Sequence, residues 1–424
     1  MKIIILGGGL AGCSIGYQLA NDGHNISVIE KSDDIGGICQ TRELGGINYE
    51  FGPHILYAKR GSKEHEHFRK FFPNFNEKKY FPRLSIDGEL DNLCFFPVTT
   101  TNILRLPHNE QVKAIEELYH INLDRPDFSN IENYIISRIG KTAYKYFFKN
   151  YNIKQWGIHP AQMDTEWCRF RNFYLRDEKH GMFGNAWQGH PGSYRGYFNQ
   201  LSKNFNIITD EIIGTSLNND SLSSVITSKG LIEGDFYIST IPIDLFLNKK
   251  DALDYRGIYK IFCLLKGKSG IPSYLLTFPN NYSFTRLMDY NQQADQSADN
   301  SLISMAFPHD AKDPALPLQK WHAEAKSFLL AKIKSEIIEY QSINQNYCYP
   351  LANKKNIDTF NNLLNQVSQL KNVITMGRLG LYAYISMCTI IKQSSIFYQM
   401  IEKFPNMTSQ ERFDFYNSVR SELI

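Results

Sequence analysis

The stretch KIIILGGGLAG, residues 2–12, decides the fold of this chain. Its first half, residues 2–6, is a short β-branched apolar run, which is typical of a strand buried on both faces. The second half satisfies the pattern G-x-G-x-x-G. Gly7 permits a tight turn, Gly9 lets a pyrophosphate approach the backbone, and Gly12 lets a helix pack closely on the strand. The stretch therefore predicts the first strand, turn and helix of a dinucleotide-binding domain.

The residues after the glycines predict the helix of this unit. The free backbone N–H groups of Leu10 and Ala11 stand at its positive end, where a pyrophosphate is bound. Residues 21–23, Asn-Asp-Gly, end the helix. Its apolar side recurs at a helical spacing: Leu10, Cys13, Tyr17 and Ala20.

A second strand and a second glycine pair complete the fingerprint. Residues 26–29 read as a strand that ends at Glu30, followed by Lys31. An acid about 20 residues beyond the glycines binds ribose hydroxyls and would repel a 2′-phosphate. The pair Gly36-Gly37 resembles the second glycine motif of FAD enzymes related to glutathione reductase and the amine oxidases. We therefore expect FAD, with an NAD-binding or an empty βαβ unit as the alternatives.

Composition restricts the class of protein. The chain has 424 residues, which suggests two or three lobes, with 21% charged and 42% hydrophobic residues. A formal net charge of +3, with no Lys/Arg block, argues against nucleic acid. Seven cysteines without a C-x-x-C pair suit reduced thiols. With no membrane-spanning stretch and no metal motif, we expect a cytoplasmic protein.

The rest of the chain alternates between strand-like and helical patterns. Residues 80–98 predict a hairpin with its turn at Asp87-Gly88. Residues 108–165 are helical in pattern, with an expected capping box at 129–132. One helix face is formed by Val112, Ile115, Leu118 and Tyr119. Further strands are expected at 236–240, 258–265, 274–278, 283–288, 302–307 and 373–376, and a helix at 388–403.

These patterns predict an α/β protein, in which a Rossmann-like FAD-binding domain is interrupted by a helical bundle and an antiparallel β-sheet domain. Strands of the first domain occur both early and late in the sequence, so that domain is discontinuous. The expected ranges are 1–75, 190–245 and 365–424 for the FAD-binding domain, 100–165 for the helical insert, and 76–99, 166–189 and 246–364 for the sheet domain.

Four blocks carry a family resemblance, and they occur in the family's order over essentially the whole chain. The chain resembles the UDP-galactopyranose mutase family in these blocks. They are Phe51–Ile55, Ile139–Lys141 with Phe147–Gly157, Phe284–Arg286, and Gly377–Gly380 with Tyr382 and Tyr384.

The resemblance implies both a fold and a chemistry. The fold is an FAD domain, a helical insert and a six-stranded antiparallel sheet around one cleft. The chemistry is the interconversion of pyranose and furanose forms of a nucleotide-diphosphate sugar, UDP-galactose or a related UDP or dTDP sugar. It proceeds on reduced FAD through a flavin N5–sugar adduct without net redox, with NAD(P)H as the external reductant. The sequence does not determine the oligomeric state, for which a homodimer is one candidate.

The resemblance also implies residue roles. Arg286 matches an arginine that binds the diphosphate, and Arg176 matches the second one across a one-residue gap. Tyr384 matches a tyrosine on the diphosphate, and His54 matches the histidine beside the flavin N5. The expected substrate residues are Phe147, Phe148, Tyr151, Asn152, Trp156 and Trp187. The expected cofactor residues are Gly7, Gly9, Leu10, Ala11, Gly12, Glu30, Lys31, Gly36, Gly37, Arg378 and Met387.

The chain departs from the family pattern near the last helix and in one strand. Where the family has an arginine between two tyrosines, this chain has Ala383. Where it has two aspartates, the chain has Ser386 and Cys388. A second family tyrosine has no counterpart, since Ala306 and Phe307 stand there. The loss of polar groups suggests a less hydroxylated sugar, such as a 6-deoxy or acetamido sugar.

Two other functions stay open at this point. Related folds include FAD-dependent amine-oxidase-like oxidoreductases, and a nucleotide-sugar binder without activity is the third hypothesis. The phosphate-directed arginines and the block 153–157 argue against an amine oxidase, because a small apolar amine needs neither. The retention of His54 and of the glycine motifs argues against an inactive binder. Fold alone does not decide among the three.

Overall fold

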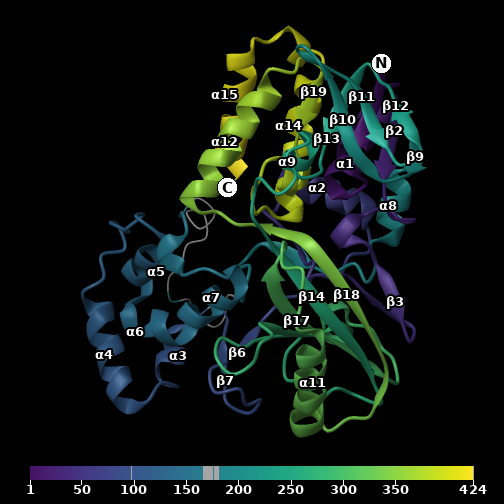
Figure 1. Ribbon diagram of the computed structural model, residues 1–424. Coiled ribbons are helices and arrows are strands. Elements are labelled where there is room, and N and C mark those ends of the chain that lie inside the picture. Colours follow the sequence, from purple (N-terminus) through teal and green to yellow (C-terminus); the bar gives the residue numbers. More distant parts are fainter. Residues whose placement is uncertain (97, 166–174, 176–180, 424) are drawn as a thin grey trace.

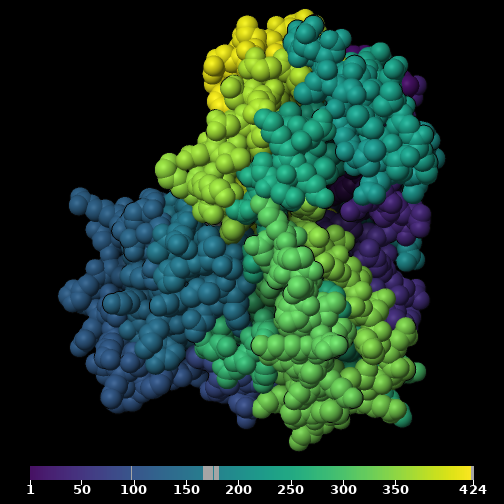
Figure 2. Space-filling view, viewed as in Figure 1, coloured from purple at the N-terminus to yellow at the C-terminus, as the bar shows by residue number. Residues whose placement is uncertain are grey.

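The computed structural model describes residues 1–96, 98–165, 175 and 181–423. Three lobes are visible in Figure 1: a sheet with covering helices at the top, a helical lobe at the lower left, and a long twisted sheet at the lower right. In the space-filling view of Figure 2, the helical lobe and the sheet lobe together form the lower half of the molecule.

The stretch that opens the chain forms the centre of the first lobe. β1 (Lys2–Leu6) lies in a five-stranded parallel sheet of order β19-β13-β1-β2-β9. Residues 3–6 have no exposed surface, because β13 and β2 pair along both edges and α1 (Leu10–Asn21) packs on the strand. The Rossmann-like prediction is thereby confirmed. The other strands are β2 (Asn25–Glu30), β9 (Asn206–Thr209), β13 (Phe236–Ser239) and β19 (Val373–Thr375).

The helical lobe follows the hairpin in sequence. In Figure 1 it is the blue region between the hairpin and the first lobe's lower helices. Its last helical stretch is continuous, because a π-helical turn at Lys145–Lys149 joins α6 to α7. The helices are α3 (Thr100–Ile103), α4 (His108–Tyr119), α5 (Ile131–Ile139), α6 (Lys141–Tyr144) and α7 (Asn150–Trp156).

The expected buried face of α4 is wrong. Val112, Ile115 and Tyr119 are 46%, 55% and 87% exposed. The inward side carries Ala114, which is 1% exposed, and Leu118, which packs on the core. A small residue lets α4 approach α6 closely, and this packing overrides the apolar stripe that the spacing indicated.

The expected capping box also begins one residue too early. The N-cap of α5 is Asn130 rather than Ser129, since the Asn130 side chain accepts the backbone N–H of Asn133 at 2.9 Å. Ser129 instead accepts a hydrogen bond from the Asn133 side chain. The start of the helix is thus fixed by an asparagine cap, which is as effective as serine.

The third lobe is built on a seven-stranded sheet of order β18-β14-β17-β16-β15-β6-β7. The expected hairpin is confirmed as β6 and β7, but it joins this sheet, and β6 runs parallel to β15. The expected number of six strands is therefore wrong, while the sheet is antiparallel except for the β6–β15 pair. The strands are β6 (Arg83–Ser85), β7 (Leu93–Phe95), β14 (Tyr255–Leu265), β15 (Leu275–Thr277), β16 (Arg286–Asp289), β17 (Ser301–Asp310) and β18 (Ile337–Pro350).

The two faces of this sheet have different partners. Odd-numbered residues of 259–265 on β14 pack with Trp321 of α11 (Leu318–Phe328). Even-numbered residues of 258–264 point the other way, toward Phe51 and the first lobe. The sheet therefore presents one face to its own helix and the opposite face to the dinucleotide-binding lobe.

Two long elements were not expected from the sequence. β18 is an edge strand of 14 residues with alternating exposed polar side chains, so its pattern has little hydrophobic signal. Most of α12 (Lys354–Ser368) falls in the range 246–364 assigned to the sheet domain, but the helix packs on α15 and β19 of the first lobe. β8 (Trp187–Gly189), from the range 166–189, likewise pairs with β5 (Leu56–Ala58). The domain boundaries stay a prediction.

Smaller elements complete the lobes. In the part of the chain that the structure describes, no helix has the length and apolar character needed to cross a membrane. The remaining strands and helices are β3 (Arg42–Leu44), β4 (Ile47–Tyr49), β10 (Ile212–Asn218), β11 (Ser221–Thr227), β12 (Gly230–Ile232), α2 (Lys63–Phe71), α8 (Arg195–Leu201), α9 (Ile243–Phe246), α10 (Tyr290–Ala294), α13 (Gly377–Gly380), α14 (Met387–Met400) and α15 (Ser409–Leu423).

Candidate active site

The three glycines at the fixed positions of the G-x-G-x-x-G pattern have three different environments. Gly7 has a φ of +101° and donates its N–H to the Ile29 carbonyl at 2.9 Å. A Cβ on Gly12 would lie 2.1 Å from the Gly7 carbonyl oxygen, so only glycine allows α1 to pack this close. A Cβ on Gly9 would meet nothing within 4 Å. Gly7 and Gly12 are therefore required for the turn and for the close helix packing, and the space above Gly9 is open to a ligand.

Glu30 and the second glycine pair lie against this loop. Glu30 Oε2 accepts the backbone N–H of Gly8 at 2.8 Å. Gly36 donates its N–H to the Gly8 carbonyl at 2.8 Å, and Gly37 lies over the Gly9 backbone. The two glycine motifs thus form one surface, with the carboxylate of Glu30 at its side.

The C-terminal residues expected at the cofactor reach the same end of the sheet. A Cβ on Gly377 would lie 2.9 Å from the Cβ of Ala11, so Gly377 and the neighbouring Arg378 lie beside the start of α1. Met387 begins α14, which packs along α1. Lys31 is exposed. The structure gathers these residues, and their contacts with a cofactor stay a prediction.

His54 lies in the segment between β4 and β5 and is half-buried, with its Nδ1 atom inside the protein. Its ring folds back over Gly52, where a Cβ would lie 2.9 Å from Nε2. Among the described residues, Nδ1 has no hydrogen-bond partner. Burial lowers the pKa of His54 to about 3, and the positive charges of Arg378, Lys260 and His190 act in the same direction. The imidazole is therefore neutral, with one ring nitrogen available to a ligand.

Hydrogen bonds fix both ends of the segment that carries His54. The Glu50 carboxylate, 1% exposed, accepts His190 Nε2–H at 2.9 Å, and Tyr290 donates to the Glu50 carbonyl at 3.0 Å. At the other end, the Tyr194 hydroxyl donates to the His54 carbonyl. The position of His54 is thus set by groups from two lobes.

Arg286 lies on the sheet face that points toward the helical and dinucleotide-binding lobes. Its Nε donates to the Tyr151 hydroxyl at 2.9 Å, and Nη1 donates to the Tyr349 hydroxyl at 3.4 Å. Within the described residues, no carboxylate forms an ion pair with Arg286. Burial raises the pKa of Tyr349 to about 12 even though Arg286 acts to lower it, so this hydroxyl keeps its proton.

Arg378, Tyr384 and Trp156 extend this cluster, which we call the Arg286 cluster together with Tyr151 and Tyr349. The guanidinium of Arg378 lies 5.0 Å from the Tyr384 ring centroid and 5.9 Å from that of Tyr349. Trp156 contacts both tyrosine rings edge-on, at centroid distances of 5.8 and 6.1 Å. Two fixed cations, hydroxyl groups and an indole face therefore meet at one place, as an anionic nucleotide requires.

The placement of α7 depends on two residues that anchor it to the sheet. Lys154 donates to the carbonyls of Phe278 and Tyr282, at 2.5 and 2.8 Å. Arg256 of β14 donates to the Gln155 carbonyl at the end of the helix, at 3.2 Å. The α7 side chains of the Arg286 cluster are thereby held against the sheet.

The other expected substrate residues differ in position. Phe147 is fully buried, and Phe148 accepts the Asn152 side-chain amide through its carbonyl at 3.0 Å. Trp187 is not brought to the Arg286 cluster, since it stacks on Phe75 at 4.3 Å in the core of the first lobe. Arg176 lies outside the described residues.

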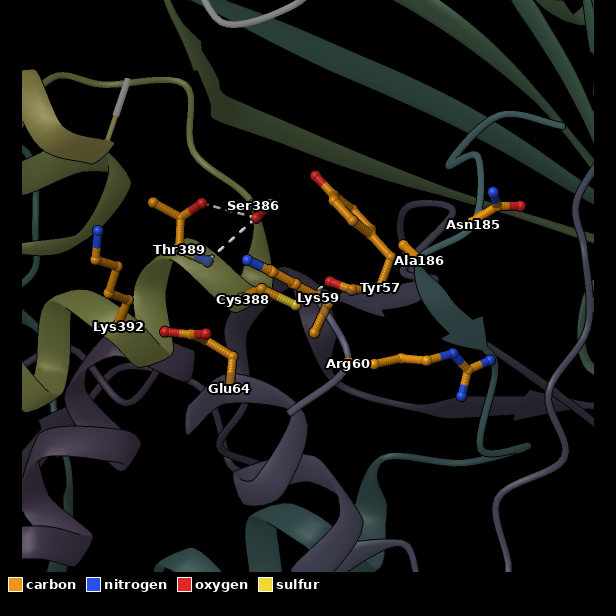
Figure 3. A pocket seen from close by; sticks show the side chains of 11 residues that line it. Tyr57, Lys59, Arg60, Glu64, Asn185, Ala186, Ser386, Cys388, Thr389 and Lys392 are labelled. Atoms are coloured by element: carbon orange, nitrogen blue, oxygen red, sulfur yellow. Dashed lines mark hydrogen bonds between the residues drawn. The ribbon is translucent and has the colours of Figure 1, made fainter. Parts of the chain in front are cut away.

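Two of the positions that depart from the family pattern, Ser386 and Cys388, line a separate groove, shown in Figure 3. Ser386 caps α14 by accepting the Thr389 N–H at 3.1 Å, and half-buried Cys388 donates its thiol to the Tyr57 carbonyl. In Figure 3 Arg60 points away from α14. The groove has a volume of about 710 Å³ and is lined by Tyr57, Ala58, Lys59, Arg60, Glu64, Asn185, Ala186, Ser386, Cys388, Thr389 and Lys392.

Sequence reasoning missed two residues of the site. Tyr349 lies on the unexpected strand β18 and contacts Arg286, and Lys260 lies on β14 beneath the His54 segment. A signal for Lys260 was its position in an otherwise apolar strand. Tyr349 had no comparable signal, because the segment around it has no apolar run. Within residues 1–96, 98–165, 175 and 181–423, no group of three or more His, Cys, Asp or Glu side chains is arranged to hold a metal ion.

Comparison with known families gives two matches. Residues 5–74 match the NAD(P)-binding Rossmann-like domain family, and residues 146–332 match the family described as UDP-galactopyranose mutase. The second range contains α7 and Arg286. The two matched regions thus supply the glycine loop and half of the Arg286 cluster, namely Tyr151, Trp156 and Arg286.

Comparison with individual proteins gives relatives of the same kind. The chain is 24% identical over 402 residues to the UDP-galactopyranose mutase of Mycoplasma genitalium, covering 91% of each chain. It is 25% identical over 282 residues to the dTDP-fucopyranose mutase of Escherichia coli, covering 60% of this chain and 71% of the other. Among solved structures, reduced UDP-galactopyranose mutase superimposes with a TM-score of 0.79 at 16% identity, over 99% of this chain and 98% of the other.

Proposed function

Because this chain belongs to the UDP-galactopyranose mutase family, we propose that it interconverts the pyranose and furanose forms of a UDP- or dTDP-linked sugar. The enzyme is an isomerase, and its substrate is a nucleotide sugar. The base and the sugar are matters for experiment. The replacement of three polar family positions by Ala383, Ser386 and Cys388 supports a 6-deoxy or acetamido sugar.

The Arg286 cluster is the observation that carries this proposal. Arg286 and Arg378 have no carboxylate partner among the described residues: Arg286 donates to the hydroxyls of Tyr151 and Tyr349, and Arg378 donates to the carbonyls of Cys348 and Ile385. Both arginines are half-buried, and a cation in such a place without a counter-ion is unfavourable unless an anion joins it. A diphosphate supplies two anionic groups with planar oxygen pairs that match guanidinium geometry.

We assign the cofactor as FAD, and the residues fit this group. The open space above Gly9, the N-terminus of α1 and the Glu30 carboxylate suit a dinucleotide. The unpartnered Nδ1 of His54 offers a hydrogen-bonding group where the flavin ring is expected. Bound FAD in its reduced form supplies the nucleophile for the anomeric carbon, and a reduced nicotinamide is the proposed external reductant.

The protein's own groups have three tasks in this reaction. Arg286 and Arg378 stabilise the charge that grows on the diphosphate as its bond to the sugar breaks, and they hold it for return. Tyr349 and Tyr384 donate hydrogen bonds to the same oxygens. Trp156 and the walls of α7 exclude water, which would otherwise capture the sugar. Arg176 is proposed as a further diphosphate ligand.

Product analysis tests the function. The dithionite-reduced protein is incubated with UDP-galactose, UDP-N-acetylgalactosamine or dTDP-fucose, and ring isomers are separated by chromatography. We expect a furanose product with at least one of these donors, no net consumption of reductant, and no turnover with oxidised protein. Oxygen consumption with an amine, and no isomer, would replace the proposal by the amine-oxidase-like alternative.

We propose a homodimer as the assembly. The exposed side of α4, with Val112, Ile115 and Tyr119, is an apolar surface that a second copy would cover. Sedimentation equilibrium of the protein and of its Ile115→Lys variant tests this. A monomer for both would contradict it.

A further inference from the structure

Lys260 is a buried lysine that the proposed function does not use. It stands in the middle of β14 and is 3% exposed. Its ammonium donates to the Tyr290 hydroxyl at 3.2 Å, to the Ser304 hydroxyl at 3.3 Å and to Met288 Sδ at 3.3 Å. All three acceptors are neutral. Within the described residues, no carboxylate forms an ion pair with this lysine.

A buried charge with neutral partners alone is unfavourable for folding. An apolar side chain of similar length would fill the same space and avoid the desolvation cost. The hydrogen bonds of Lys260 orient its ammonium but do not neutralise it. The lysine therefore serves something other than the stability of the sheet.

The direction of the Lys260 side chain indicates which of the two expected anions, the diphosphate or the reduced flavin, its ammonium faces. Arg286 is separated from Lys260 by one strand, since Lys260 pairs with Ala306 and Ala306 pairs with Arg286. The Lys260 ammonium lies 5.6 Å from the Phe51 ring, in the segment that leads to His54. Tyr290 links it to that segment, because the same hydroxyl binds the Glu50 carbonyl. The charge thus faces the His54 segment, one strand away from Arg286.

We propose that Lys260 is a positioning residue of the flavin site, whose ammonium stabilises the negative charge of the reduced flavin beside the His54 segment. This inference rests on the proposed function only in taking the cofactor to be FAD. A cation near the ring favours the electron-rich state, so Lys260 raises the midpoint potential of the bound flavin. The reaction needs reduced flavin, and Lys260 makes that state easier to reach and to keep.

The charges around Lys260 are consistent with this role. Burial first, and then Arg286 on β16, lower the pKa of Lys260 to about 7. Glu50, from the His54 segment, and Cys348 on β18 act in the opposite direction. An added negative charge favours the protonated amine, so reduction of the flavin and protonation of Lys260 stabilise each other.

The test is the midpoint potential of the bound flavin, measured by slow enzymatic reduction with a reference dye. Lys260→Met keeps the length of the side chain and removes the charge. We expect its oxidised-to-reduced equilibrium to shift about tenfold toward oxidised flavin, or about 30 mV for a two-electron couple. Lys260→Arg, which keeps a positive charge, should have a midpoint potential between those of Lys260→Met and wild type. The difference from wild type narrows as the pH rises above about 7, where the lysine loses its proton.

Lys266→Met is the matched control, because Lys266 is an exposed lysine at the end of the same strand region and pairs with Glu336 at the surface. Its potential should equal that of wild type. A Lys260→Met potential equal to wild type would overturn the proposal. So would an unchanged potential with weakened UDP binding, since the lysine would then serve the diphosphate. Both results are independent of turnover, so they are distinct from a failure of the mutase assignment.

Discussion

The glycine loop and the Arg286 cluster meet in one molecule but are built in different ways. In the loop, Gly7, Gly9 and Gly12 act through their backbones, and Glu30 bonds Gly8 across 22 residues. In the cluster, Arg286 meets Tyr151 across 135 residues, and its other contacts come from further segments. A binding site made from local backbone can be read from a short motif, whereas a site made from distant side chains exists only after folding.

The largest expected effect is at a loop glycine that leaves room for a ligand rather than one that allows close packing of the helix. Gly9→Val places a side chain where the structure is open and the backbone is extended, so the protein should fold and bind no flavin. Absorbance near about 450 nm and the thermal midpoint of unfolding measure both parts. Gly196→Val, at an open glycine of α8, is the control and should remain yellow. A yellow Gly9→Val protein would mean that the cofactor does not approach this loop.

The next effect concerns a variant of the Arg286 cluster that leaves the glycine loop unchanged. Arg286→Ala should keep bound flavin but reduce kcat/KM by roughly 30- to 1000-fold, because a fixed cation at a departing phosphate is lost. Steady-state kinetics with the active nucleotide sugar measure the loss, and flavin content is recorded in parallel. Arg195→Ala, at an exposed arginine of α8, should match wild type. Unaltered kinetics in Arg286→Ala would remove this residue from the site.

A smaller effect tests the tyrosine that the sequence did not reveal. Tyr349→Phe removes the hydroxyl that accepts from Arg286 and keeps the ring contacts with Tyr384 and Trp156. One hydrogen bond is worth about 1 kcal/mol, so we expect a fall of about fivefold in kcat/KM. Tyr347→Phe, on the same strand, is the control. Equal kinetics for the two variants would show that Tyr349 only packs.

The parts of the fold that were predictable share one property. Residues 2–30 form two apolar strands and a glycine turn, and these two strands pair with each other across a short connection in the sequence. The hairpin at 83–95 and the strands of the second sheet also carried local patterns. β18 did not, because an edge strand with polar side chains needs no apolar period. The face of α4 was wrong because packing by Ala114 replaced the stripe.

The residues of the candidate site also differ in whether a local sequence pattern predicted their position. The family blocks carried Tyr151, Trp156 and Arg286 correctly to one place, since each block is a contiguous segment. Trp187 lay outside any block, and the structure puts it in an aromatic core with Phe75. Residues that respond to distant partners, such as Lys260, have no motif of their own. The sequence shows the type of residue, and only the fold shows what surrounds it.

The last prediction concerns the pH dependence of kcat/KM, to which we expect His54 to make no contribution. Burial lowers its pKa to about 3, below the ordinary value of 6.5, so no step of kcat/KM between about pH 5 and 8 should come from this group. Its titration should appear in stability instead. Between the two pKa values the unfolded chain binds the proton and the folded chain does not, so the free energy of unfolding rises with pH and falls on acidification. Urea unfolding of the flavin-loaded protein should therefore lose less stability from pH 7 to about pH 4.5 in His54→Gln than in wild type, while His120→Gln, at an exposed histidine, should follow wild type. If His54→Gln and wild type lose equal stability over that range, the histidine is charged in the folded protein, and the neutral imidazole assigned to this site is wrong.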